Sequence, residues 1–262
     1  MKQIWLVLII TLYFSTIANA QDSIVDQEVR VNSQIWLDYN FTSPLKEAQN
    51  IRTQIGFRKI TPNIYNRFLG ISTWNIKNQN SIFKSKKEAP FVKSFHLGAG
   101  MLFTQNVDNN NNFEFRLIQG LKFEIPTIKP VTLYNYFRLE QRFQNSFDNS
   151  GWKSAFRMRY RVSTILSWNK HYLSFAKGLY VPLNAELFVN LQRADRFNDL
   201  IRISPGIGYR LDDSWRFEFY LIFNRTKNIT ETNNKSSDFI FRLRVFNSPA
   251  KKEEQNILEE EF

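Results

Sequence analysis

Apolar and polar side chains alternate between residues 137 and 162, on both sides of a polar segment at Asn145–Gly151, with Gln141 the one polar residue at an apolar position of the first arm. The apolar positions are Phe137, Leu139, Phe143, Phe156, Met158, Tyr160 and Val162. The charged positions between them are Arg138, Glu140, Arg142, Arg157, Arg159 and Arg161. A period of two places successive side chains on opposite faces of a strand. The pattern therefore predicts a β-hairpin with one apolar and one charged face.

Such a hairpin is compatible with two environments. In a soluble β-sandwich the apolar face packs in the core and the arginines lie in water. In an outer-membrane barrel the apolar face meets lipid, and the charged face lines the lumen, where arginines pair with acids. In that second case we expect Arg159 to pair with Glu140.

Nine further segments alternate, Arg67–Ile76 less regularly because of Gly70, and with the two hairpin arms they give about eleven candidate strands. These segments are Ser33–Thr42, Asn50–Ile60, Arg67–Ile76, Phe95–Phe103, Phe113–Ile125, Leu179–Asn190, Ile201–Leu211, Trp215–Arg225 and Phe239–Phe246. Many exceed the soluble average of about five to six residues and approach the roughly 9–11 that a membrane strand needs. Bacterial barrels have even strand numbers. We therefore predict twelve strands, with ten as the alternative, and place the additional strand within residues 67–93.

The predicted fold class is thus all-β, a transmembrane outer-membrane antiparallel β-barrel with an arginine- and glutamate-lined lumen. Ten charged side chains are assigned to a lumen charge ladder. They are Glu114, Arg116, Arg138, Glu140, Arg142, Arg157, Arg159, Arg161, Glu186 and Arg202.

The two ends of the chain differ in character from the alternating region. Residues Met1–Ala20 combine an early lysine, an apolar run and the small-x-small sequence Ala18-Asn19-Ala20, which predicts a secretory signal cleaved before Gln21. Residues 21–247 form the predicted single barrel domain. Residues 248–262 form a predicted disordered, acidic tail. The expected location is the cell outer membrane, reached by export through the periplasm.

Several segments resemble the outer-membrane β-barrel family catalogued as domain of unknown function 2490. They are Gln34-Ile35-Trp36-Leu37, Phe113-Glu114-Phe115-Arg116, Arg138-Leu139-Glu140-Gln141-Arg142, Arg157-Met158-Arg159-Tyr160-Arg161, Asn184-Ala185-Glu186-Leu187-Phe188 and Ile201-Arg202-Ile203 leading to Gly206-Ile207-Gly208-Tyr209. The resemblance covers nearly the whole mature chain. It implies a secreted barrel with a charged lumen and no known activity, and it supplies no catalytic residues. The acidic tail after Phe246 departs from the usual barrel, whose last strand ends the chain in an aromatic residue.

The residues available for chemistry are few. The chain has no cysteine and two histidines, His96 and His171, so we expect no metal and no cofactor. His96 with Ser94 on the same strand face is the one nucleophile–base candidate. An isolated histidine of this kind is more often structural, so the chain is predicted not to be an enzyme.

The charged faces allow two interpretations. Unpaired arginines would form a selective lining for an anionic solute. Alternatively the charges pair in a packed ladder that fills a narrow barrel, which we favour because small barrels are commonly filled by their own side chains.

The predicted function is that of a non-enzymatic outer-membrane barrel, structural or a narrow solute channel. An outer-membrane lipid-modifying enzyme and a soluble periplasmic β-sandwich are the alternatives. The expected partners are outer-membrane lipid and, for the basic loop 77–93, lipopolysaccharide phosphates. The formal net charge of +11 is spread through the strands rather than clustered, which argues against nucleic-acid binding.

Overall fold

The computed structural model describes residues 30–46, 48–61, 65–78, 92–107, 110–125, 132–148, 151–167, 178–192, 199–227 and 235–249. These residues form eleven strands. The strands are β1 (Arg30–Lys46), β2 (Gln49–Thr61), β3 (Tyr65–Lys77), β4 (Val92–Asn106), β5 (Asn112–Ile125), β6 (Leu133–Asn145), β7 (Trp152–Ser167), β8 (Leu179–Gln192), β9 (Asp199–Arg210), β10 (Trp215–Lys227) and β11 (Lys235–Asn247).

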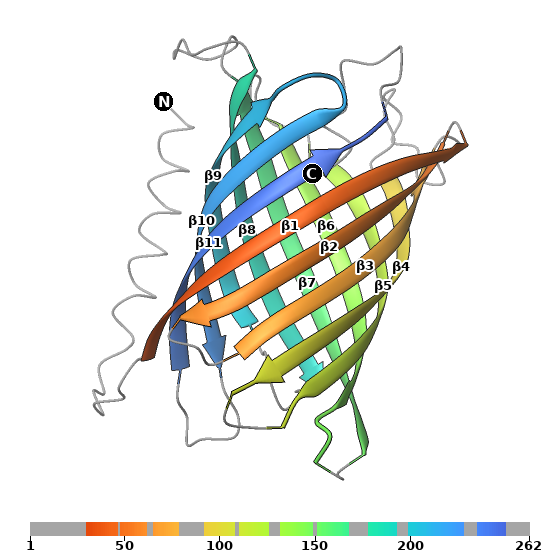
Figure 1. Ribbon diagram of the computed structural model, residues 1–262. Coiled ribbons are helices and arrows are strands. Elements are labelled where there is room, and N and C mark those ends of the chain that lie inside the picture. Colours follow the sequence, from red (N-terminus) through yellow and green to blue (C-terminus); the bar gives the residue numbers. More distant parts are fainter. Residues whose placement is uncertain are drawn as a thin grey trace, which may run out of the picture.

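The strands close into one barrel in which each strand pairs with its neighbours in sequence (Figure 1). Ten of the junctions are antiparallel, and the eleventh, between β1 and β11, is parallel. An up-and-down barrel with an odd number of strands has a first and a last strand that run in the same direction, so the closing pair is parallel. The prediction of an all-β barrel is confirmed, and the prediction of a β-sandwich is wrong.

The predicted strand number, about twelve with ten as the alternative, is close to the eleven observed, and the purely antiparallel pairing is wrong. Each of the eleven candidate segments corresponds to one strand. The predicted additional strand within residues 67–93 has no place in the barrel, because β3 pairs directly with β4 from Tyr65 and Asn106 to Lys77 and Ser94. The additional strand is predicted because bacterial barrels have even strand numbers. The parallel pairing of β1 with β11 closes the barrel with eleven strands, so no further strand is required.

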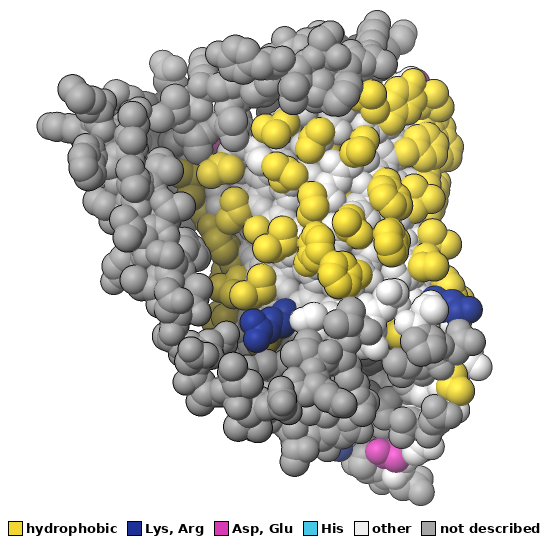
Figure 2. Space-filling view, turned by 90° about the vertical axis from the view of Figure 1, so that its left-hand side faces the viewer, with side chains coloured by type: hydrophobic (Ala, Val, Ile, Leu, Met, Phe, Trp, Pro, Cys, Tyr) yellow, Lys and Arg dark blue, Asp and Glu magenta, His cyan; other side chains and the backbone are white. Residues whose placement is uncertain are grey.

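The alternation in sequence becomes an alternation between the outside and the inside of the barrel. On β1, Ile35 is 46% exposed and Asp38 is 4% exposed. Figure 2 shows hydrophobic side chains spread over the described outer wall, with lysine and arginine side chains below them. The barrel therefore has an apolar exterior and a polar, charged interior. Among the described residues no helix is long and apolar enough to cross a membrane.

The two ends of the barrel are named here from β1: the lower end is where β1 begins at Arg30, and the upper end is where it ends at Lys46 (Figure 1). Side chains near the lower end fill the interior. Ile222 and Ile240 are 0% exposed and pack with Trp36 and Tyr220 in one apolar cluster. The predicted signal segment and most of the predicted tail lie outside the described residues, as does His171.

Candidate functional site: the charged lumen

The structure places all ten side chains of the predicted ladder inside the barrel. Eight of them are nearly fully buried, and Arg159 and Arg161 line an internal cavity. They do not form one continuous ladder. They gather instead around three carboxylates, those of Glu114, Glu140 and Glu186.

Glu114 holds the group nearest the lower end. Its two carboxylate oxygens each accept a hydrogen bond from Arg142, both at 2.9 Å. Arg116 adds a close ion pair, and the Gln144 amide donates at 2.7 Å. Glu114 and Arg142 are each 1% exposed. A buried carboxylate with this many donors is a fully compensated charge.

Glu140 sits at the centre of a second group. Its oxygens lie 2.7 Å from Arg138 Nη2 and 2.6 Å from Arg157 Nη2, with Arg116 Nη1 at 3.4 Å. Arg116 therefore links the Glu114 and Glu140 groups. Because β6 and β7 pair in register, Arg157 lies directly opposite Glu140.

Glu186 gathers the third group from β7 and β9. It pairs closely with Arg159, and its oxygens lie 2.5 Å from Arg161 Nε and 3.2 Å from Arg202 Nη1. The prediction that Glu140 is the partner of Arg159 is therefore incorrect for the main contact. Arg159 Nη1 lies 3.9 Å from Glu140 but turns its other nitrogen to Glu186 on the neighbouring strand.

Two further carboxylates complete the network and were not assigned from sequence. Asp38 on β1 lies 2.5 Å from Arg242 Nε across the parallel junction and accepts a hydrogen bond from Gln54 at 2.8 Å. Glu218 on β10 pairs with Arg216 and Arg244, both at 3.3 Å. The alternation on β1 placed Asp38 on the inner face, so the signal was available.

Two tyrosines reach Glu218 because glycines make room for their rings. The hydroxyls of Tyr180 and Tyr220 donate to Glu218 at 2.9 and 2.7 Å. A Cβ atom at Gly208 would lie 2.2 Å from the Tyr180 ring, and one at Gly206 would lie 2.6 Å from the Tyr220 ring. Gly206 and Gly208 of β9 therefore leave room for the rings of Tyr220 and Tyr180, because neither glycine has a side chain.

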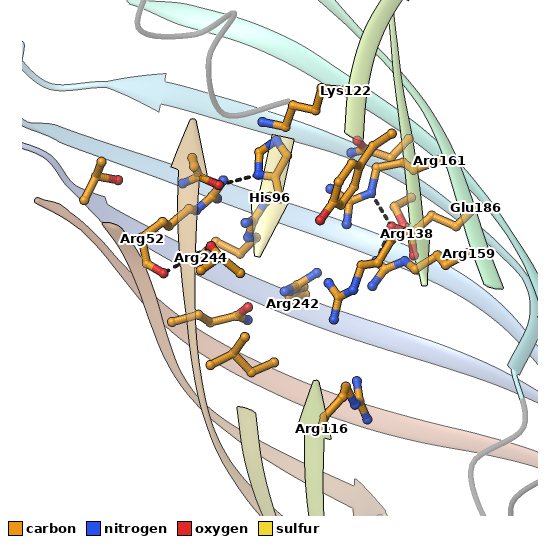
Figure 3. Close-up of a pocket in the computed structure, with 18 of the residues that line it drawn as sticks. Arg52, His96, Arg116, Lys122, Arg138, Arg159, Arg161, Glu186, Arg242 and Arg244 are labelled. Atoms are coloured by element: carbon orange, nitrogen blue, oxygen red, sulfur yellow. Dashed lines mark hydrogen bonds and ion pairs between the residues drawn. The ribbon is translucent and has the colours of Figure 1, made fainter. Parts of the chain in front are cut away.

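The lumen contains an open cavity of about 220 Å³, which extends from the upper rim at Lys77 down to Arg58 and Arg67 in the lower parts of β2 and β3. Its described lining contains eleven arginines, Lys77 and Lys122, and one carboxylate, that of Glu186. Arg242 and Arg244 enter it from β11, and Figure 3 shows them in the same space as Arg138 and Arg159. The side chains available there can bind anions, because guanidinium groups donate several hydrogen bonds and carry a fixed positive charge.

Arginines also face each other directly across neighbouring strands. Arg116 is the register partner of Arg142, Arg138 of Arg159, and Arg58 of Arg67. Like charges directly opposite each other destabilise a sheet unless something lies between them. Glu114 bridges the first pair and Glu140 contacts both members of the second. Arg58 instead stacks on the Trp36 ring at 3.9 Å, and its Nε has no hydrogen-bond partner within the described residues.

The one nucleophile–base candidate forms a hydrogen-bonded chain. Ser94 Oγ lies 2.8 Å from His96 Nε2, and His96 Nδ1 contacts Asn75 Oδ1. Asn75 in turn donates to Asn50 at 2.6 Å. If Nδ1 carries the proton toward Asn75, then Nε2 accepts the Ser94 hydroxyl, which is the arrangement of a Ser-His-Asn triad. His96 is buried against Tyr136, and Lys122 lies beside it (Figure 3).

Metal binding has no support within the part of the chain that the structure describes, where no group of three or more acidic, histidine or cysteine side chains is placed to hold an ion.

Comparison with known proteins gives one match. The model of a family described as "Protein of unknown function (DUF2490)" matches residues 33–235. No curated protein and no solved structure matches the chain.

Proposed function

The chain belongs to the DUF2490 family of proteins of unknown function, and for this member we propose the role of a non-enzymatic, integral outer-membrane β-barrel whose lumen is closed by its own side chains. The observation that carries the proposal is the inverted distribution of polarity. The outer wall exposes large apolar side chains on strand after strand, and the interior holds arginines and carboxylates.

Water is a poor solvent for this exterior. Soluble monomers rarely expose a contiguous apolar patch larger than a few hundred Å². Here exposed apolar residues occur on many strands around the barrel, including Leu37, Ile55, Met101, Ile203 and Phe241. Lipid is the solvent that such a surface fits, because a closed barrel leaves no unpaired strand edge inside the bilayer.

The strand lengths agree with a membrane span. The strands contain 12 to 17 residues. Thirteen residues at about 3.4 Å, tilted by about 40°, cover roughly 34 Å along the membrane normal, which exceeds the apolar band of about 25 Å. Each strand can therefore cross the apolar band and still reach the polar layer on both sides.

Fully buried side chains inside the barrel support a closed lumen rather than an open channel. Glu114, Arg142, Ile118, Ile222 and Ile240 are all at most 1% exposed there. An ion would have to displace paired charges or apolar side chains to pass.

The test is membrane fractionation of cells that produce the full chain, followed by electrophoresis of unboiled and boiled detergent extracts and circular dichroism. We expect the protein in the outer-membrane fraction, a heat-dependent change in mobility, and a strand-dominated spectrum. Release of the protein into the aqueous fraction after osmotic shock would refute the membrane proposal.

A lipid-modifying hydrolase is the second candidate, favoured by the Ser94–His96–Asn75 chain. Against it, the burial of His96 and, secondly, Lys122 beside it disfavour the imidazolium that a general base becomes during reaction. Hydrolysis of phospholipid and short-chain ester substrates by the purified protein, compared with Ser94→Ala, separates the two. The matched control is Ser72→Ala, which removes an outward hydroxyl paired with Thr53. Loss of a measurable hydrolysis in Ser94→Ala alone would establish the hydrolase.

A further inference from the structure

We propose that the cavity in the lumen is a binding chamber for a compact, multivalent phosphate anion that enters from water at the upper end. The inference concerns the cavity and does not depend on the membrane proposal, because its readout is ligand binding by the folded barrel. Four observations lead to it.

The first is the space. A volume of about 220 Å³ is many times the roughly 10–15 Å³ that holds a single water molecule. It suits a compact anion and excludes a folded chain. Lys77, Pro44 and Pro249 belong to the lining and lie at the upper ends of β3, β1 and β11, so the cavity reaches the upper rim of the barrel.

The second is the imbalance of charge. In the described interior, seven arginines are nearly fully buried and six more line the cavity, against six buried carboxylates. Burial of uncompensated charge is costly, and the cost falls when a counter-charge is bound. An excess of this size calls for an anion with more than one charge.

The third is the set of hydrogen-bond donors that remain available. The Nε atoms of Arg58, Arg138, Arg159 and Arg244 are buried and have no hydrogen-bond partner among the described residues. All four side chains line the cavity. Each buried donor without an acceptor carries a desolvation cost, and a bound oxyanion that accepts its hydrogen bond would offset this cost.

The fourth is the geometry of these donors. Guanidinium groups offer planar forks that match phosphate oxygens in pairs, whereas a spherical anion such as chloride accepts no such fork. Arginines approach from β2, β6, β7 and β11, so one anion can be contacted from several sides. Phosphate chemistry fits this surround because its oxygens point in several directions.

The closed wall of the barrel favours a phosphate compound that enters from water over a lipid headgroup that enters from a bilayer. Every strand is paired with both neighbours, so the wall has no lateral gap through which a lipid could reach the chamber. Lys77 and Pro249 line the cavity at the upper rim, so we expect the ligand to enter from that end.

The experiment is isothermal titration of the full chain, folded in detergent, with inorganic pyrophosphate at low ionic strength. We expect saturable binding that sodium chloride of matched ionic strength does not reproduce. Arg58→Gln combined with Arg244→Gln should weaken the binding at least tenfold. Arg225→Gln, which removes an exposed arginine on β10 outside the cavity, should leave it unchanged.

Two outcomes would overturn the proposal: no saturable binding by the wild-type protein, or equal weakening by the cavity variant and the Arg225→Gln control. If the double variant does not fold, Arg58→Lys is the replacement, because it keeps the charge and loses the fork. Pyrophosphate should also raise the wild-type melting temperature more than chloride does, and an equal rise would count against the chamber. Addition of phosphatidylglycerol to the micelles should not compete, and competition would overturn the water-borne source.

Discussion

Two pairs of arginines that oppose each other across neighbouring strands have opposite surroundings. Arg116 and Arg142, in the lower half of the lumen, share the Glu114 carboxylate, which binds Arg142 through two hydrogen bonds of 2.9 Å. Arg58 and Arg67, on the wall of the cavity, have the same register relation, yet Arg58 lies on the Trp36 ring instead. The backbone arrangement is the same, and the position of a carboxylate differs.

The comparison shows how one repeated strand pattern yields two kinds of interior. Glu114 lies two residues from Arg116 on the same face of β5. Its carboxylate bridges Arg116 and Arg142, so the charges pair and fill the lumen at that point. Where no glutamate stands at that position, Arg58 lies on the Trp36 ring and Arg67 donates to Thr104 instead, and both side chains line the cavity. The Glu114 group is therefore a structural core made of ions, and the wall formed by Arg58 and Arg67 is a cationic surface of the cavity.

The largest expected effect is on the bridged pair. Glu114→Gln removes the shared carboxylate and leaves two buried guanidinium groups without it, so we expect a loss of about 3–5 kcal/mol in the free energy of unfolding. Denaturant unfolding of the protein in detergent or lipid vesicles measures this loss. Stability equal to that of the wild type would contradict the view of the Glu114 group as an ionic core.

Arg159 is intermediate between the two pairs, because it forms an ion pair with Glu186 and also lines the cavity. Arg159→Leu leaves Glu186 with Arg161 and Arg202, so we expect a loss of only about 1–3 kcal/mol. Adding Glu140→Leu should not restore stability, since Glu140 serves Arg138 and Arg157 as well. Recovery in the double variant, followed by its melting temperature, would show that Glu140 is the true partner.

A smaller effect is expected for the unbridged pair. Arg58→Gln loses the contact with Trp36 but relieves the repulsion from Arg67, so stability should stay within about 1 kcal/mol of the wild type. The same unfolding measurement, repeated at low and high salt, tests the balance. A loss as large as that of Glu114→Gln would mean that both pairs are equally structural.

The smallest expected effect concerns ion flow. Purified protein in planar bilayers should show little or no conductance, because the Glu114–Arg142 group and the Ile222–Ile240 cluster fill the lumen below and beside the cavity. Steady, large unitary currents with anion selectivity would instead indicate a path through the ion pairs.

The inner and outer faces were predictable from sequence because a period of two is a local property of each strand. The segment Ser33–Thr42 illustrates this, with Ile35 outside and Asp38 inside. The eleven candidate segments correspond to the eleven strands, whereas the general rule of even strand numbers led to the prediction of twelve. That rule describes most bacterial barrels but is not a physical requirement for a closed sheet.

The partners inside the lumen were less accessible from sequence. Arg159 turns to Glu186 rather than Glu140 because the choice depends on the register between β7 and β8 and on side-chain direction, neither of which is fixed by spacing along one strand. The cavity depends on how long side chains from eleven strands meet in three dimensions. Arg58 belongs to a predicted polar face, yet nothing in its own segment indicates that its guanidinium group lies on the Trp36 ring.

The parallel closure of the barrel separates the two ends of the strand order. Arg30 begins β1 at the lower end and Asn247 ends β11 at the upper end, whereas an even-stranded barrel returns its last strand to the side where it started. In a bilayer, Arg30 and Asn247 would therefore lie on opposite sides, and a water-soluble label added to one side only would reach one of these two strand ends and not the other.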